Sequence, residues 1–145
     1  MVAPERNLNA QSSDEPSAAR NQQRVLIVDD ERDTVATLMQ LLADEGYQVR
    51  GVYKARDAIA AMRDFDPDAV LLDLALPDVS GWEAARQIRG RYGDKRPVLI
   101  AITGRYKQPS DRLLGQLAGF DHQLEKPCDP QELITLLAKQ PPRTS

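Results

Sequence analysis

The sequence lacks cysteine pairs, long apolar runs and an excess of positive charge. Its one cysteine, Cys128, cannot form an internal disulfide, and no CxxC-type metal spacing is present. No run approaches the roughly 18 consecutive apolar residues of a membrane span, and the N-terminal residues lack the apolar core of a signal peptide. The 19 basic and 22 acidic residues leave a net charge of -3, which argues against direct nucleic-acid binding. These absences predict a cytoplasmic protein with no membrane insertion.

The length of 145 residues suits a single domain. Residues 1–23 are rich in Asn, Gln, Ser, Ala and Pro and contain no aromatic residue, so we expect a flexible N-terminal arm. Residues 24–140 carry the ordered domain, and residues 141–145, with two prolines, form a short C-terminal tail.

Short apolar runs alternate with amphipathic stretches through the domain. The runs predict strands at residues 24–28, 47–53, 68–74, 97–103 and 120–124. Three of them are nearly continuous Val, Ile and Leu, which is typical of strands buried on both faces of a parallel sheet. The stretches between and after them predict helices around residues 35–42, 58–65, 82–91 and 110–117, with a fifth helix opening at residues 129–132. Five strands alternating with five helices predict one open α/β sheet.

Polar residues follow four of the five predicted strands. They are Asp29 and Asp30 after the first strand, Asp73 near the end of the third, Thr103 at the end of the fourth and Lys126 after the fifth. Because ligands bind at the carboxyl ends of strands in open α/β sheets, we expect these side chains to converge on one edge.

Three neighbouring carboxylates repel one another, so they favour a bound cation. Oxygen ligands of this kind suit a hard divalent ion that retains water, which indicates Mg²⁺. A lysine and a hydroxyl beside the metal complete a pocket for a phosphoryl group. Asp73 is the natural nucleophile, because a carboxylate can accept a phosphoryl group as an acyl phosphate.

Residues 24–139 resemble the receiver domain of two-component response regulators, the chemotaxis-regulator-like family. The resemblance rests on four segments: VLIVDDE (25–31), LLDLALPDVSGWE (71–83), AITG (101–104) and GFDHQLEKPCDP (119–130). It implies a doubly wound, five-stranded parallel sheet of flavodoxin-like order 2-1-3-4-5 with helices on both faces. It further implies a signalling phosphoacceptor, not an enzyme acting on a separate substrate.

The resemblance also implies a metal site and its ligands. Asp30 would bind Mg²⁺ directly, Asp29 directly or through water, and Asp73 and the main-chain carbonyl of Ala75 would supply the remaining protein ligands. The family often has a cis bond at the position of Lys126-Pro127.

The phosphoryl group would come from a phosphohistidine of a sensor or hybrid histidine kinase, or of a histidine phosphotransfer protein, and would be accepted by Asp73. Thr103 would hydrogen-bond the phosphoryl group and Lys126 would pair with it. Phosphorylation would then change the face formed by the fourth helix, the fifth strand and the fifth helix, where a downstream target would bind. The resemblance leaves open whether the protein forms a homodimer.

The sequence departs from the family at the expected switch. The family usually has an aromatic residue or histidine three positions before the lysine, where Gln123 stands here. Tyr106 is a candidate to take over part of that role. Arg105, two positions after Thr103, and Ala75, two after Asp73, occupy positions that tune access of water to the acyl phosphate in the family.

Three further interpretations concern single side chains or short runs. The run from Arg86 to Arg96 carries five basic residues and is interpreted as a solvated basic face. Cys128 is expected to be a small buried filler, not a redox thiol. Trp82 is expected to pack at the start of the third helix, near the site.

The sequence is compatible with more than one function. The favoured one is a stand-alone receiver without an output domain, and its alternative is a receiver that acts as a phosphorylation-independent scaffold. A metal-dependent phosphohydrolase using Asp73 is disfavoured, because the haloacid-dehalogenase type requires a second aspartate at the position where Ala75 stands. A flavin-mononucleotide binder is disfavoured, because the loop after the first strand is acidic and would repel phosphate.

Overall fold

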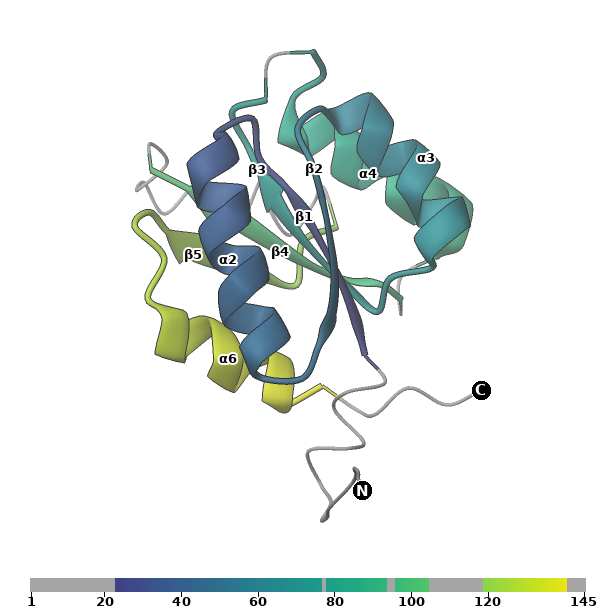
Figure 1. The fold of residues 1–145 in the computed structure, drawn as a ribbon. Helices are drawn as coiled ribbons and strands as arrows, with labels where there is room; N and C mark the ends of the chain where they lie inside the picture. Colours follow the sequence, from purple (N-terminus) through teal and green to yellow (C-terminus); the bar gives the residue numbers. More distant parts are fainter. Residues whose placement is uncertain (1–22, 77, 94–95, 105–118, 141–145) are drawn as a thin grey trace.

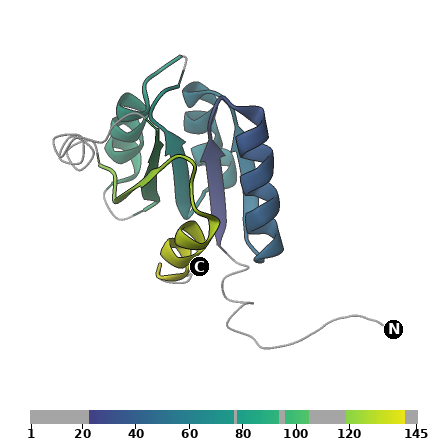
Figure 2. The ribbon, with the colours of Figure 1, turned by 90° about the vertical axis from the view of Figure 1, so that its left-hand side faces the viewer.

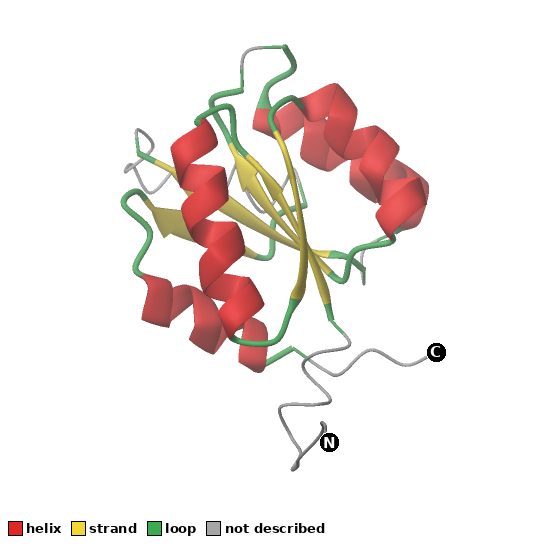
Figure 3. Ribbon diagram, in the orientation of Figure 1, coloured by secondary structure: helices red, strands yellow, loops and turns green. Residues whose placement is uncertain are grey.

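One parallel sheet forms the centre of the molecule (Figures 1 and 3). The structure, a computed structural model, describes residues 23–76, 78–93, 96–104 and 119–140. The strands are β1 (Arg24–Val28), β2 (Gln48–Val52), β3 (Ala69–Asp73), β4 (Val98–Thr103) and β5 (His122–Glu125). Their order is β2-β1-β3-β4-β5, with every neighbouring pair parallel. The implied strand order is therefore confirmed, and the strand order reverses between β1 and β3.

Four helices lie within the described residues. They are α2 (Arg32–Asp44), α3 (Ala55–Phe65), α4 (Gly81–Tyr92) and α6 (Pro130–Ala138). The helix expected at residues 110–117 lies outside the described part of the chain. Helices α2 and α3 begin three residues before their predicted apolar stripes, since the first turn of each contributes few apolar side chains.

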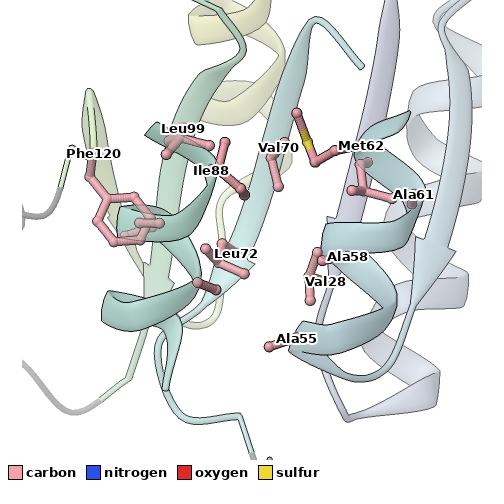
Figure 4. Packing of buried hydrophobic residues seen from close by; sticks show 14 of the residues in the cluster. Val28, Ala55, Ala58, Ala61, Met62, Val70, Leu72, Ile88, Leu99 and Phe120 are labelled. Carbon is pink, nitrogen blue, oxygen red and sulfur yellow. The ribbon is translucent and has the colours of Figure 1, made fainter. Parts of the chain in front are cut away.

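The helices cover both faces of the sheet, as the family resemblance implied. Figure 2 shows α2 and α4 on opposite sides of the strands. Alternate residues of each central strand point to opposite faces, so Leu26 and Val28 join the cluster under α3 and α4 (Figure 4), whereas Val25 and Ile27 join the one under α2 and α6. Burial of each such side chain stabilises the fold by about 1.5–3 kcal/mol. The two apolar clusters hold the sheet from both sides.

A close contact sets the position of α2 over the edge strand β2. A Cβ added at Gly51 would lie 2.4 Å from Val35 Cγ1 and 2.9 Å from Met39 Sδ, so a larger residue there would require these two side chains to shift. Because α2 begins immediately after the acidic residues that follow β1, its first turn lies at the carboxyl edge of the sheet.

The helix ends follow the capping residues in the sequence. Asp129 caps α6 by accepting a hydrogen bond from the main-chain N–H of Gln131, and Pro130 occupies the first turn. Gly46, with a φ of 96°, follows the end of α2 in the left-handed region that favours glycine. The predictions for these two ends are confirmed.

The predicted solvated basic face is wrong for Arg89. Its side chain is only 9% exposed. Its guanidinium donates to the carbonyls of Gly93, Pro97 and Gly119 and forms an ion pair of 2.6 Å with Asp121. Arg89 therefore ties the end of α4 to the starts of β4 and β5, which is a structural role.

The other basic residues of that run differ from one another. Arg86 is 70% exposed at its side chain, as expected of a solvated face. Arg96 forms an ion pair with the buried Asp68 at the amino edge of the sheet. Lys95 lies outside the described residues.

Candidate functional site

Three carboxylates meet where β1 and β3 end, on either side of the reversal in strand order. Asp29 and Asp30 follow β1, and Asp73 is the last residue of β3. One carboxylate oxygen from each lies within 4.8 Å of the others. Asp29 and Asp73 are buried at 3% and 4% exposure, whereas Asp30 is exposed. The convergence expected from the sequence is therefore present.

Lys126 reaches the same cluster from the loop after β5. Its Nζ lies 3.0 Å from Asp29 Oδ2 and 3.2 Å from Asp73 Oδ2. The main-chain N–H of Lys126 donates to the carbonyl of Thr103 at the end of β4, 2.9 Å away, which holds the loop against the sheet. The Lys126-Pro127 bond is cis, as the family resemblance implied, and so is the Arg96-Pro97 bond, which the sequence did not predict.

Main-chain N–H groups orient the two buried carboxylates. The N–H of Glu31 donates to Asp29 Oδ1 and that of Ala75 donates to Asp73 Oδ1, each at 2.9 Å. In each case the remaining oxygen, Oδ2, is the one next to Lys126. Both carboxylates are thus held with one oxygen toward the chain's own backbone and one toward the cluster.

Burial and charge compete at this cluster. Burial raises the pKa of Asp29, and the charge of Asp73 adds to the effect, while the Glu31 N–H and Lys126 oppose it. Burial alone would lower the pKa of Lys126, but its contacts with Asp29 and Asp73 outweigh burial and raise its pKa. One ammonium faces three carboxylates, so the cluster favours an additional cation.

The donor set fits Mg²⁺. The available ligands are carboxylate oxygens close enough to share one ion, and hard oxygen ligands are what Mg²⁺ prefers. The resemblance implied the main-chain carbonyl of Ala75 as a further ligand. Ala75 lines a cavity that Asp30 and Asp73 also line.

An open cavity of about 580 Å³ contains the site. Its lining residues are Asp30, Glu31, Asp73, Ala75, Thr103, Gly104 and Lys126. Thr103 is buried at 4% exposure where β4 ends, so the hydroxyl-bearing residue predicted for the site is at its wall. The cavity therefore combines carboxylates, one ammonium and a threonine, which is a set able to bind a phosphoryl group with a metal ion.

Glu31 is a lining residue that the sequence reasoning did not single out. It also lines a neighbouring groove of about 470 Å³ between α2 and the loop after β5, together with Leu38 and Cys128. Glu31 and Lys126 border both spaces. The signal available in the sequence was its position directly after Asp29 and Asp30.

The expected switch residues are only partly described. Gln123 is half-buried in β5, where it pairs in register with Ala101 of β4. Arg105 and Tyr106 lie outside the described residues.

Trp82 packs at the start of α4 as expected, whereas Cys128 packs against the cluster under α2 and α6 but is less buried than expected. Trp82 is the second residue of α4 and packs edge-on against Phe120, with ring centroids 5.9 Å apart. Cys128 is half-buried, and burial together with the nearby acidic groups of Glu132 and Asp129 raises the pKa of its thiol to about 11. A thiol of this kind is a poor nucleophile at neutral pH.

The fold and this acidic edge define a receiver domain, and the chain belongs to the response regulator receiver domain family. The family model matches residues 25–138. Members of the family are the receiver domains of signalling proteins in two-component systems. Within the described ranges, no helix is both long and apolar enough to cross a bilayer.

Comparison with curated proteins gives relatives among the mycobacteria. The chain is 38% identical to response regulator MprA of Mycolicibacterium vanbaalenii and 37% identical to that of Mycobacterium tuberculosis. Each match extends over 111 residues, covering 77% of this chain and 47% of the relative. The chain therefore spans about half the length of these relatives.

Solved structures agree with the fold. The chemotaxis protein CheY4 of Vibrio cholerae aligns with a TM-score of 0.75 at 26% identity, over 80% of this chain and 96% of that one. A CheY-like receiver domain protein of Methanospirillum hungatei aligns with a TM-score of 0.72 at 28% identity, over 79% and 90% of the two chains.

Proposed function

We propose that the chain accepts a phosphoryl group on Asp73 from a phosphohistidine of a partner protein, with Mg²⁺ bound beside it. The observation that carries this proposal is the convergence of three carboxylates, within 4.8 Å of one another, with the ammonium of Lys126. A structural ion pair needs one carboxylate for one ammonium, whereas this cluster has an excess of acceptor oxygens.

The carboxylates of Asp29, Asp30 and Asp73 and the main-chain carbonyl of Ala75 would hold Mg²⁺. When bound, the ion neutralises negative charge on the carboxylates and on the incoming phosphoryl oxygens, which would otherwise repel one another.

The chain's own groups would then perform the transfer. A carboxylate oxygen of Asp73 attacks phosphorus, the new P–O bond forms, and the P–N bond to the donor imidazole breaks. The N–H of Ala75 holds Asp73 in a fixed orientation, which lowers the entropy lost in reaching the transition state. Lys126 and Thr103 supply positive charge and a hydroxyl donor for the phosphoryl oxygens.

The donor would be a sensor or hybrid histidine kinase, or a histidine phosphotransfer protein. The acyl phosphate would bias a pre-existing equilibrium of the face around β5 and residues 104–112, to which Gln123, Arg105 and Tyr106 belong, and so change the binding of a downstream target.

Intact-mass measurement with a small phosphodonor tests the proposal. With acetyl phosphate and Mg²⁺, we expect a gain of about 80 Da, one phosphoryl group on the nucleophile. The gain should disappear with EDTA and in the variant Asp73→Asn. Asp64→Asn, which changes an exposed carboxylate on α3, is the matched control and should gain the same mass.

A mass gain that persists in Asp73→Asn would contradict the assignment of the acceptor. If neither acetyl phosphate nor an autophosphorylated histidine kinase changes the mass of the wild type, a scaffold receiver becomes the better description.

A further inference from the structure

Helix α3 receives its N-terminal cap from a distant loop. Its own N-cap residue, Lys54, has extended backbone angles but makes no capping hydrogen bond through its side chain. Instead the carboxylate of Asp78, in the loop between β3 and α4, accepts from the N–H groups of Ala55 at 3.0 Å and Arg56 at 3.1 Å. Each Asp78 oxygen thus satisfies one otherwise unpaired N–H of the first turn.

Asp78 is held firmly in this position. Its side chain is 17% exposed, and the guanidinium of Arg56 adds an ion pair of 3.8 Å. Burial would raise the pKa of Asp78, but the hydrogen bonds from Ala55 and Arg56 outweigh it and lower the pKa to about 2. The contact therefore joins the loop to α3 through a carboxylate that is charged at neutral pH.

The same loop is closed at its far end by Gly81. The N–H of Gly81 donates to the carbonyl of Leu74 at 3.2 Å. A Cβ at Gly81 would lie 2.6 Å from the carbonyl oxygen of Asp73, so the two ends of the loop approach too closely for any other residue. Between these ends, Leu76 and Val79 pack against the apolar cluster under α3 and α4.

The start of the loop, at Ala75, forms part of the wall of the cavity that contains the acidic site. Ala75 comes two residues after Asp73, donates its N–H to Asp73 Oδ1 and lines the cavity. Ala75 belongs to no helix or strand, so its carbonyl is positioned only by the contacts that hold the loop.

We propose that Asp78 is a positioning residue for the metal site: by tying the loop to the N-terminus of α3, it holds the carbonyl of Ala75 where Mg²⁺ binds. This inference rests on the proposed function, because it concerns the Mg²⁺ site of Asp73. Groups that orient a metal ligand without touching the metal typically contribute 10- to 100-fold to metal affinity. Asp78 acts through one ligand of several, so we expect roughly a tenfold weaker Mg²⁺ affinity when its carboxylate is removed.

The test separates positioning from simple helix capping. Mg²⁺ affinity would be measured by amide NMR titration, following Ala75 and Glu31, in the wild type, Asp78→Ala and the double variant Lys54→Ser/Asp78→Ala. Serine at the N-cap position supplies a local cap to α3, for which the extended angles of Lys54 are suitable, but no link to the loop. Asp64→Ala, on the same helix, controls for the lost negative charge.

We expect Asp78→Ala to raise the Mg²⁺ dissociation constant about tenfold and the double variant to recover thermal stability without recovering Mg²⁺ affinity. If affinity returns with stability in the double variant, or if Asp78→Ala binds Mg²⁺ like the wild type, Asp78 is only a helix cap. Should Asp78→Ala fail to fold, Asp78→Asn, which keeps one acceptor oxygen, gives the same comparison with a smaller shift.

Mg²⁺ binding and phosphorylation of the wild type distinguish failure of the positioning role from failure of the proposed function. If it binds Mg²⁺ and gains the phosphoryl mass but the Asp78 variants are unaffected, only the positioning role is overturned. If the wild type does not bind Mg²⁺, both are overturned.

Discussion

The ammonium of Lys126 lies 3.2 Å from the carboxylate of Asp73, although 53 positions separate them in the sequence. The second contact of Lys126, with Asp29, draws residues from the ends of β1, β3 and β5 into one cluster. In this arrangement Lys126 partly offsets the repulsion between buried carboxylates, which is also what a bound Mg²⁺ would do.

Replacing Lys126 with methionine should therefore increase the stabilisation that Mg²⁺ provides. Without the metal, the variant leaves its carboxylates unpaired, and we expect a loss of about 1–3 kcal/mol in the free energy of unfolding. Urea unfolding in EDTA and in saturating Mg²⁺ measures both quantities. Lys139→Met, at the exposed end of α6, is the control and should change neither. A smaller Mg²⁺ effect in Lys126→Met than in the wild type would contradict the prediction.

Acid should weaken the fold through Asp78. Its pKa is lowered to about 2 in the folded protein, below the ordinary value of 3.8. A carboxyl with a lowered pKa contributes stability above its unfolded pKa and loses it as the pH falls through the folded one. Asp78→Asn should therefore be less stable than the wild type by about 1 kcal/mol at neutral pH, the usual value of a helix cap. The difference should shrink between pH 4 and pH 2, roughly the interval between the two pKa values.

Thermal unfolding of both proteins across this pH range measures the effect. A difference that stays constant down to pH 2 would mean that the Asp78 carboxylate is not the source of the stabilisation.

Removing the guanidinium of Arg89 should destabilise the protein more than any exposed arginine does. Arg89→Met would remove the guanidinium that donates to the carbonyls of Pro97 and Gly119, and it would leave the Asp121 carboxylate with the Leu99 N–H but without its ion pair. Buried acceptors that lose a charged donor cost about 1–3 kcal/mol each, and we expect a total of at least about 2 kcal/mol. Arg86→Met, on the exposed side of the same helix, should stay within about 0.5 kcal/mol of the wild type. Equal effects of the two substitutions in urea unfolding would refute the structural role of Arg89.

Cys128 should react slowly with thiol reagents. Its pKa of about 11, against an ordinary 9.0, makes the thiolate fraction roughly a hundredfold smaller at neutral pH. Labelling by a disulfide reagent at pH 7.5 should be slower in the folded protein by about that factor than in the protein unfolded in guanidinium chloride. Fast labelling of the folded protein would show that the thiol is more exposed and more acidic than its surroundings imply.

The strands and the acidic site were predictable because they depend on local patterns. Runs such as RVLIV are typical of strands buried on both faces, and Asp29 and Asp73 come where such runs end. The parallel direction of the strands then brings those ends together. Asp30 and Lys126 follow by the same reasoning.

The contacts of Arg89 and Asp78 could not be predicted in this way. Asp78 caps a helix that begins 23 positions earlier, and Arg89 meets a carbonyl 30 positions later. No periodicity within α3 or α4 encodes such a partner, because the contact depends on how two elements pack. Arg86 and Arg89 belong to the same basic run on the same helix, and only the fold shows that the first is exposed and the second is buried.

The main-chain hydrogen bond from Lys126 to Thr103 joins the backbone at the two points from which their side chains project. These are the two groups proposed to contact the phosphoryl oxygens: Thr103 is the last residue of β4, and Lys126 comes directly after β5. A displacement of the loop that carries Lys126 would therefore act directly on the end of β4, which carries Thr103. The ammonium and the hydroxyl proposed to bind the phosphoryl oxygens would respond to such a movement together, as one mechanical unit.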